Sequence, residues 1–133
     1  MKQLLILNET ISDIKKASDV FKNIKKINID YTQENFILIC LDTKNNIIKS
    51  EIVFKGGLNA CVVCPKTLFR KALLNNSNSI IVAHNHPSND LTPSDEDRKV
   101  YDKLKLIGDE LTLKVLDNII FNEKEFYAFS DSE

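Results

Sequence analysis

The chain has 133 residues, of which 43% are hydrophobic and 28% are charged, and its formal net charge is -1. These values are typical of one globular domain with an ordinary core, so we expect a single domain over residues 1–133. The 18 lysines and arginines nearly balance the 19 aspartates and glutamates. The balance disfavours both a broadly basic surface for nucleic acid and an acidic disordered segment.

The lack of a recognisable targeting segment and the odd number of cysteines together predict a cytoplasmic protein. The apolar stretch 4–7 is too short for the central region of a signal peptide, and no apolar run is long enough to span a membrane. Cys40, Cys61 and Cys64 are an odd number of cysteines, which disfavours a secreted disulfide framework. We expect Cys61 and Cys64 to be small buried residues without a redox role.

The first elements expected are a helix and a hairpin. From Ile11 to Ile24, apolar residues recur three or four positions apart with lysines between them, which predicts an amphipathic helix within an N-terminal region 1–30. Its lysines are interpreted as a solvated face rather than a binding surface. The apolar segments 36–41 and 47–54 flank a polar turn and predict a buried β-hairpin.

A second helix and a buried strand follow. Pro65 is expected to open a helix whose apolar residues lie between Leu68 and Leu73. The run 80–83 is short, rich in β-branched residues and ends directly at His84. This pattern is typical of a buried strand that delivers functional residues at its end.

The last part of the chain predicts a third helix and a closing pair of strands. Thr92 is expected to be the helix N-cap, with Pro93 and several acidic residues in the first turn. Gly108 is expected to end this helix. The apolar segments 111–121 and 126–129 are then expected to pair as strands.

Both histidines of the chain lie in one short string, at His84 and His86. Residues two apart in extended backbone point to the same face, so both imidazoles can converge on one ion, and the following loop could bring Asp97 to the same point. Two imidazoles and a carboxylate suit zinc best, and three ligands leave the fourth tetrahedral position for water, as in catalytic sites. Each residue alone has an ordinary structural explanation; their conjunction predicts a metal site.

A catalytic zinc site also needs a base that takes a proton from the attacking water. The spacing of the acidic residues does not select that base.

Specific motifs resemble a known family. His84, His86, Ser94 and Asp97 match the JAMM signature in residue type and spacing. The string HNHPSNDLTPSDED resembles the characteristic loop of RadC proteins, and EIVFKGGLNACVVCPKTLFRKAL resembles the segment that precedes it. The resemblance covers residues 33–129 and is to the C-terminal JAB/MPN domain of RadC proteins, without the helix-hairpin-helix segment that precedes it in full-length members.

The resemblance implies a fold and a set of site residues. The expected fold is an α/β (α+β) JAB/MPN domain, a mixed β-sheet flanked by helices with a cytidine-deaminase-like architecture, holding one zinc ion per chain. The base in JAMM proteins is a glutamate near the start of an early strand, which points to Glu34, with Glu51 as the alternative. Ser94 would stabilise the oxyanion that develops on the substrate. Asn85 and Ser88 could orient the ligands.

Some positions depart from the RadC pattern. Asn89 stands where glycine is usual, Leu91 where proline is frequent, Gly57 where threonine commonly follows the first glycine, and Asn118 where a histidine is frequent. None of these departures removes an expected ligand. Because of them, the loop geometry and substrate preference of RadC proteins are not carried over to this chain in detail.

Two classes of function therefore remain. The first is a zinc-dependent metallopeptidase or isopeptidase that cleaves an amide bond in a peptide or a modified protein. The alternative is a non-catalytic or DNA-repair-associated accessory module of the RadC type, which would predict salt-sensitive DNA binding, and a silent scaffold with a structural ion also stays open. A zinc deaminase is disfavoured because His86 stands where its signature has a glutamate.

Overall fold

The centre of the molecule is a five-stranded mixed sheet with the strand order β2-β1-β3-β4-β5. The structure is a computed structural model, and it describes residues 16–56 and 63–132. β1 pairs antiparallel with both β2 and β3, β3 and β4 are parallel, and β5 returns antiparallel to β4. The strands are β1 (Asn35–Leu41), β2 (Ile47–Lys55), β3 (Ser79–Asn85), β4 (Lys114–Phe121) and β5 (Phe126–Ala128).

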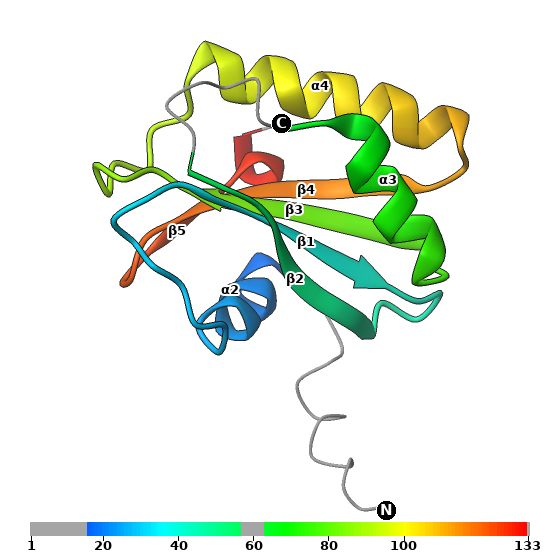
Figure 1. Ribbon diagram of the computed structural model, residues 1–133, viewed down its shortest axis with the longest axis horizontal. Helices are drawn as coiled ribbons and strands as arrows, with labels where there is room; N and C mark the ends of the chain where they lie inside the picture. Colours follow the sequence, from blue (N-terminus) through cyan, green and yellow to red (C-terminus); the bar gives the residue numbers. More distant parts are fainter. Residues whose placement is uncertain (1–15, 57–62, 133) are drawn as a thin grey trace, which may run out of the picture.

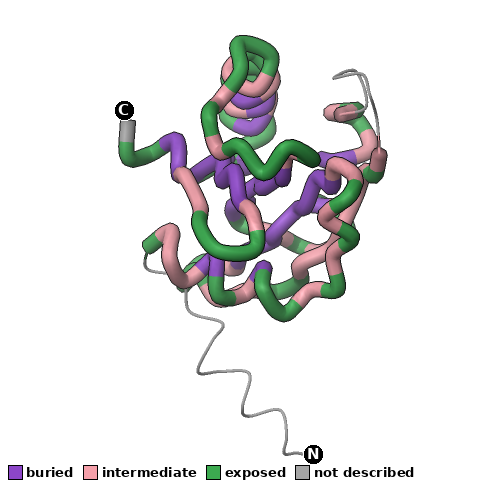
Figure 2. The backbone as a smooth tube through the Cα atoms, turned by 90° about the vertical axis from the view of Figure 1, so that its left-hand side faces the viewer, coloured by how far each residue is buried: buried purple, intermediate pink, exposed green. Residues whose placement is uncertain are grey.

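Helices cover both faces of this sheet (Figure 1). α3 (Pro65–Leu74) and α4 (Asp95–Glu110) lie on one face, α2 (Ala17–Ile24) lies on the other, and a short 3-10 helix, η2 (Phe129–Ser132), follows β5. Strand residues alternate between the two layers of core, so Leu38 packs on the side of α3 and α4 while Ile37 and Ile39 pack towards α2. Figure 2 shows the buried residues concentrated in the central strands. The α+β architecture with a mixed sheet is confirmed.

Most expected elements lie close to their predicted positions. The hairpin is formed by β1 and β2, and Pro65 is the first residue of α3. α2 begins at Ala17, and the earlier part of the predicted helix, from Ile11, lies outside the described residues. No helix in the described ranges is both long and apolar enough to cross a membrane.

Both predicted ends of the third helix are wrong. The N-cap of α4 is Ser94 rather than Thr92, because Ser94 and Asp97 hydrogen-bond reciprocally across the first turn. Gly108 does not end the helix, which continues to Glu110. It lies instead where the backbone of Leu113 approaches closely: a Cβ at Gly108 would lie 2.4 Å from the Leu113 carbonyl oxygen.

The prediction that Cys64 is buried is also wrong, since its side chain is exposed. Cys64 is the N-cap residue of α3, directly before Pro65, and this position projects towards solvent. The pKa of its thiol is lowered, chiefly because the backbone N–H of Thr67 donates to it. Cys61 lies outside the described residues.

The strand pairing brings three chain segments to one edge of the sheet. Because β1 and β3 are antiparallel, the start of β1 lies beside the end of β3, and Phe36 pairs with His84. α4 then connects β3 to the parallel strand β4, so its first turn begins near the same edge. The residues expected to form the site come from these three segments.

Candidate metal centre

The two histidines project from the end of β3. His84 lies within the strand, and His86 follows its last residue. Their rings are on the same side of the chain, and the ring centroids are 5.1 Å apart. His84 is 2% exposed whereas His86 is half-buried, so the site lies at the boundary between core and solvent.

The loop after β3 is shaped by its own hydrogen bonds. The Asn89 N–H donates to the carbonyl of His86 at 2.8 Å, and the Ser88 hydroxyl accepts from the Asp90 N–H at 3.2 Å. Asn89 has a left-handed backbone conformation with a φ of 67°, which asparagine adopts more readily than most residues other than glycine. Asn89, which stands where RadC proteins usually have glycine, therefore allows this turn.

This loop fixes the orientation of His86. The Nδ1 atom of His86 lies 2.8 Å from the Asp90 carbonyl oxygen. Because a carbonyl oxygen can only accept, Nδ1 must carry the hydrogen of that bond. In the neutral ring, Nε2 then carries the lone pair that a metal ion needs.

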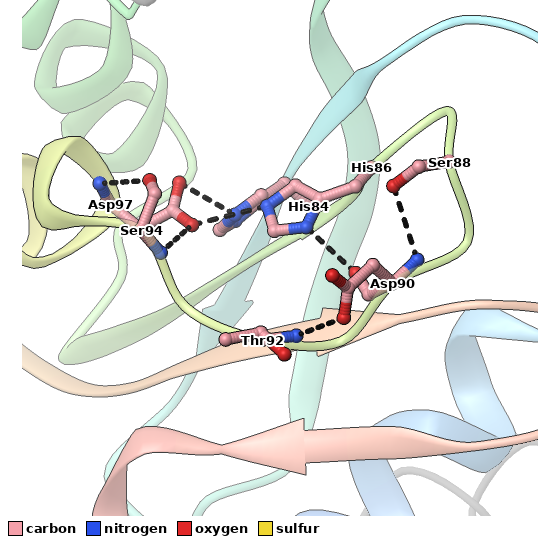
Figure 3. Close-up of polar contacts among 7 residues, drawn as sticks. All are labelled: His84, His86, Ser88, Asp90, Thr92, Ser94 and Asp97. Atoms are coloured by element: carbon pink, nitrogen blue, oxygen red, sulfur yellow. Dashed lines mark hydrogen bonds and ion pairs between the residues drawn. The ribbon is translucent and has the colours of Figure 1, made fainter.

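Asp97 joins the start of α4 to both histidines (Figure 3). Its N–H donates to the Ser94 hydroxyl at 3.0 Å, while its Oδ2 accepts from the Ser94 N–H at 2.9 Å. The same carboxylate lies 3.1 Å from His84 Nε2 through Oδ1 and 3.1 Å from His86 Nε2 through Oδ2. The capping interaction thus holds the carboxylate between the two imidazoles.

The contact between His86 and Asp97 requires a positive charge. With the hydrogen on Nδ1, an uncharged His86 would place a lone pair against a carboxylate oxygen, so either a proton or a metal ion must lie between these acceptors. In the absence of metal, the hydrogen bond to Asp97 raises the pKa of His86. Burial opposes ionisation of Asp97, but the two histidines hold the pKa of this carboxylate well below its usual range.

His84 adds an independent sign of a missing partner. Its ring stacks on Phe36, with the centroids 5.9 Å apart and the planes inclined by 10°. Its Nε2 lies 3.1 Å from Asp97 Oδ1, whereas its Nδ1 has no hydrogen-bond partner among the described residues. A buried imidazole nitrogen without a partner is costly unless it binds something else.

These three side chains could together hold a metal ion. One candidate ligand atom from each of His84, His86 and Asp97 lies within 4.8 Å of the others. Imidazole nitrogens and carboxylate oxygens are ligand types that zinc and other first-row metal ions accept. The structure brings together all three ligands that the sequence predicts.

Glu34 borders the same site. It directly precedes β1, and it is half-buried. Burial raises the pKa of its carboxyl group, while the nearby His84 and His86 lower it. A pocket of about 30 Å³ adjoins the site, and its lining consists of Glu34, Phe36, Val63, His84, Glu96, Asp97, Val100 and Asn118.

Glu51 and Ser94 have other neighbours. The carboxylate of Glu51 lies 3.4 Å from Lys71 Nζ and 3.7 Å from Lys49 Nζ, and Glu51 pairs with Leu38 rather than with the start of β1. Ser94 caps α4, and its hydroxyl accepts one hydrogen bond there. Its own hydrogen can still be donated, so the capping role is compatible with a second one.

Sequence reasoning missed how Asn35 and Asn85 hold Glu34. Both asparagines are fully buried. Asn85 Oδ1 accepts from the Asn35 N–H at 2.8 Å, and Asn85 Nδ2 donates to the Gln33 carbonyl at 3.0 Å. Asn85 therefore fixes the backbone on both sides of Glu34, and Ser88 hydrogen-bonds within the loop that holds His86. The sequence signal for this arrangement was Asn35, a polar residue directly before the apolar run of β1.

Asn118 was likewise missed as a pocket residue. It is 2% exposed, and its Oδ1 has no hydrogen-bond partner among the described residues. Its place beside the site follows from the parallel pairing of β3 and β4, which local sequence patterns do not reveal.

Comparisons with known proteins agree with this fold. A family model described as RadC-like JAB domain matches residues 14–133. UPF0758 protein SH1266 of Staphylococcus haemolyticus is 43% identical over 119 residues, covering 90% of this chain and 52% of the relative. UPF0758 protein CPE2144 of Clostridium perfringens is 38% identical over 132 residues, covering 99% and 58%.

A third relative is similar over a shorter part of the chain. UPF0758 protein Mbar_A2303 of Methanosarcina barkeri is 46% identical over 99 residues, covering 74% of this chain and 43% of the relative. The chain spans about half the length of the curated relatives it matches. The family match covers nearly all of the sequence, and the chain therefore belongs to the RadC-like JAB domain family.

Proposed function

We propose that this domain is a zinc-dependent hydrolase that cleaves an amide bond, as a metallopeptidase or an isopeptidase. The observation that carries the proposal is the placement of His84 and His86 against the two oxygens of Asp97, each at 3.1 Å. The hydrogen bond from His86 to Asp90 leaves Nε2 as the metal-binding nitrogen. A zinc ion with these three ligands would supply Lewis-acid activation of water at an open coordination position.

Glu34 is the proposed base. It borders the pocket beside His84 and Asp97, and it is sufficiently buried for its pKa to be raised. A carboxylate with a raised pKa is a stronger base, so Glu34 can take a proton from the attacking water and pass it to the leaving amine. Glu51 is a weaker candidate because its carboxylate is engaged by Lys49 and Lys71.

Ser94 is the proposed oxyanion donor. Its hydroxyl accepts from the Asp97 N–H at 3.0 Å, which restricts the side-chain rotamer and leaves the hydroxyl hydrogen available. Directed at the carbonyl oxygen of a bound substrate, this hydrogen would stabilise the negative charge that develops during attack. The proposed substrate is an amide in a peptide or a modified protein.

The decisive experiment measures metal content and hydrolysis separately. We expect about one zinc per wild-type chain, and loss of zinc from His84→Ala and Asp97→Ala. Glu34→Gln should retain zinc but lose about 10²- to 10⁴-fold of the hydrolysis of a peptide or isopeptide library. Glu51→Gln is the matched control, and it should keep both zinc and activity.

The outcomes separate the two classes of function. Zinc bound without hydrolysis would favour the accessory module, and DNA binding that weakens as salt is raised would support that alternative further. Failure of the wild type to bind supplied zinc, or hydrolysis that survives chelation, would overturn the proposal.

A further inference from the structure

Two buried atoms beside the candidate metal centre lack hydrogen-bond partners: one is a nitrogen that can donate, and the other is an oxygen that can accept. His84 Nδ1 and Asn118 Oδ1 are both buried, and neither has a partner among the described residues. Both residues line the same pocket. Such unpaired groups are uncommon in folded proteins and require a physical explanation.

The chemistry of His84 defines what Nδ1 needs. Its Nε2 faces Asp97 Oδ1 at 3.1 Å, so Nε2 is the nitrogen available to a metal ion. A neutral imidazole that offers a lone pair at Nε2 carries its hydrogen at Nδ1 and requires an acceptor there. For His86 that acceptor is the Asp90 carbonyl, 2.8 Å away.

Asn118 offers the corresponding acceptor for His84. In the parallel pairing of β3 and β4, His84 lies opposite Ile120 and Asn118 lies opposite Val82. Asn118 is therefore a diagonal neighbour of His84 on the same face of the sheet. The other unpaired buried oxygens among the described side chains belong to Asn35 and Ser79, which do not line this pocket.

The pocket is large enough to hold a water molecule. Its volume is about 30 Å³, whereas a water needs about 10–15 Å³ of such space and two or more polar partners. We infer that Asn118 is a positioning residue for His84, accepting through one bridging water the hydrogen bond that His84 Nδ1 donates. This inference extends the proposed metal site, because it assigns the group that fixes the tautomer of one ligand.

Two substitutions of similar size test the role of the Asn118 oxygen. Asn118→Leu removes the acceptor, and zinc affinity measured by competition with a chelator should fall by about 10- to 100-fold. Asn118→Asp retains an acceptor and should bind zinc at least as tightly as the wild type. Val100→Ala changes the same pocket from α4 without touching the acceptor and should leave zinc affinity unchanged.

A spectroscopic readout separates positioning from a general loss of structure. In zinc-loaded protein, ring nitrogen chemical shifts should report His84 with the hydrogen on Nδ1, and Asn118→Leu should alter these shifts while the backbone spectrum stays folded. Wild-type zinc affinity and unchanged His84 shifts in Asn118→Leu would overturn the inference. Failure of Asn118→Asp to exceed Asn118→Leu in affinity would also overturn it.

A crystal structure of the wild-type protein tests for the bridging water even if no zinc is bound. We expect a water within hydrogen-bond distance of both His84 Nδ1 and Asn118 Oδ1, and its absence would contradict the bridge. Failure to bind zinc would instead overturn the proposed function, so the two failures are distinguishable.

Discussion

Asp97 combines two tasks in one carboxylate. Its Oδ2 accepts from the Ser94 N–H at 2.9 Å and lies 3.1 Å from His86 Nε2. The first turn of α4 and the candidate metal centre therefore share an atom. A substitution at Asp97 removes a candidate ligand and part of the helix cap together, so His84→Ala is the cleaner test of metal binding.

The burial of Glu34 predicts the acidic limb of the pH profile. Burial raises the pKa of this carboxyl group, and a base acts only when it is deprotonated. We expect kcat/KM to fall as the pH drops through this raised pKa, at a higher pH than for an ordinary glutamate. The profile of Glu34→Gln, measured on the same substrate, should lack this limb, and an unchanged limb would assign it to another group.

Asn85→Leu should destabilise the fold at the edge that carries Glu34. The change leaves the Asn35 N–H and the Gln33 carbonyl without the partners that Asn85 supplies. We expect the free energy of unfolding to fall by about 2–4 kcal/mol, measured by urea denaturation. Asn78→Leu, at an exposed asparagine, is the control and should change stability by less than about 0.5 kcal/mol.

Among the helices and strands, α4 is held in place by specific contacts at both of its ends. Its first turn holds Asp97, and its last turn packs so closely on the following loop that the Leu113 N–H donates to the Gly108 carbonyl at 2.7 Å. Thr112 completes this connection with a φ of 56°. The helix is thus fixed at both ends before β4 begins.

Gly108→Ala should be destabilising although alanine is the better helix former. The added Cβ would lie 2.4 Å from the Leu113 carbonyl oxygen, and the required shift should cost about 1–3 kcal/mol in thermal or denaturant unfolding. Asp109→Ala, at the neighbouring exposed position, should stay within about 0.5 kcal/mol of wild type. A Gly108→Ala protein more stable than wild type would contradict the close approach.

The sequence was informative wherever a local pattern decides the structure. The run that became β3, the opening of α3 at Pro65 and the convergence of both histidines with Asp97 could all be predicted from spacing and residue type. The cap of α4 could not, because Thr92 and Ser94 both suit an N-cap and only the contact with Asp97 distinguishes them. The place of Asn118 depends on strand pairing between distant segments.

At the scale of the whole molecule, the candidate site joins the sheet to one helical layer. The proposed base directly precedes β1, two candidate ligands lie at and just after the end of β3, and the third comes from the first turn of α4. The sheet is covered on both faces (Figure 1), so these elements have little freedom to move apart while the core is intact. Metal binding and folding should consequently be coupled.

Zinc should raise the thermal stability of the wild-type protein. At a free zinc concentration about 100 times the Kd, binding to the folded state contributes about 2.7 kcal/mol, equivalent to a Tm increase of roughly 10 °C for a domain of this size. A chelator should reverse the increase in calorimetry or a dye-based melt. His84→Ala is the control, and an equal zinc-induced increase in that variant would place the effect elsewhere.

The antiparallel pairing of Phe36 with His84 has a consequence for tolerance to insertion. The sheet, rather than the connection between β3 and α4, sets the separation of Glu34 from His84. Extra residues placed in the exposed stretch 87–90 would disturb the support of His86, yet they would leave Glu34 and His84 in register. Lengthening this loop should therefore displace His86 while the spacing of Glu34 and His84 is kept.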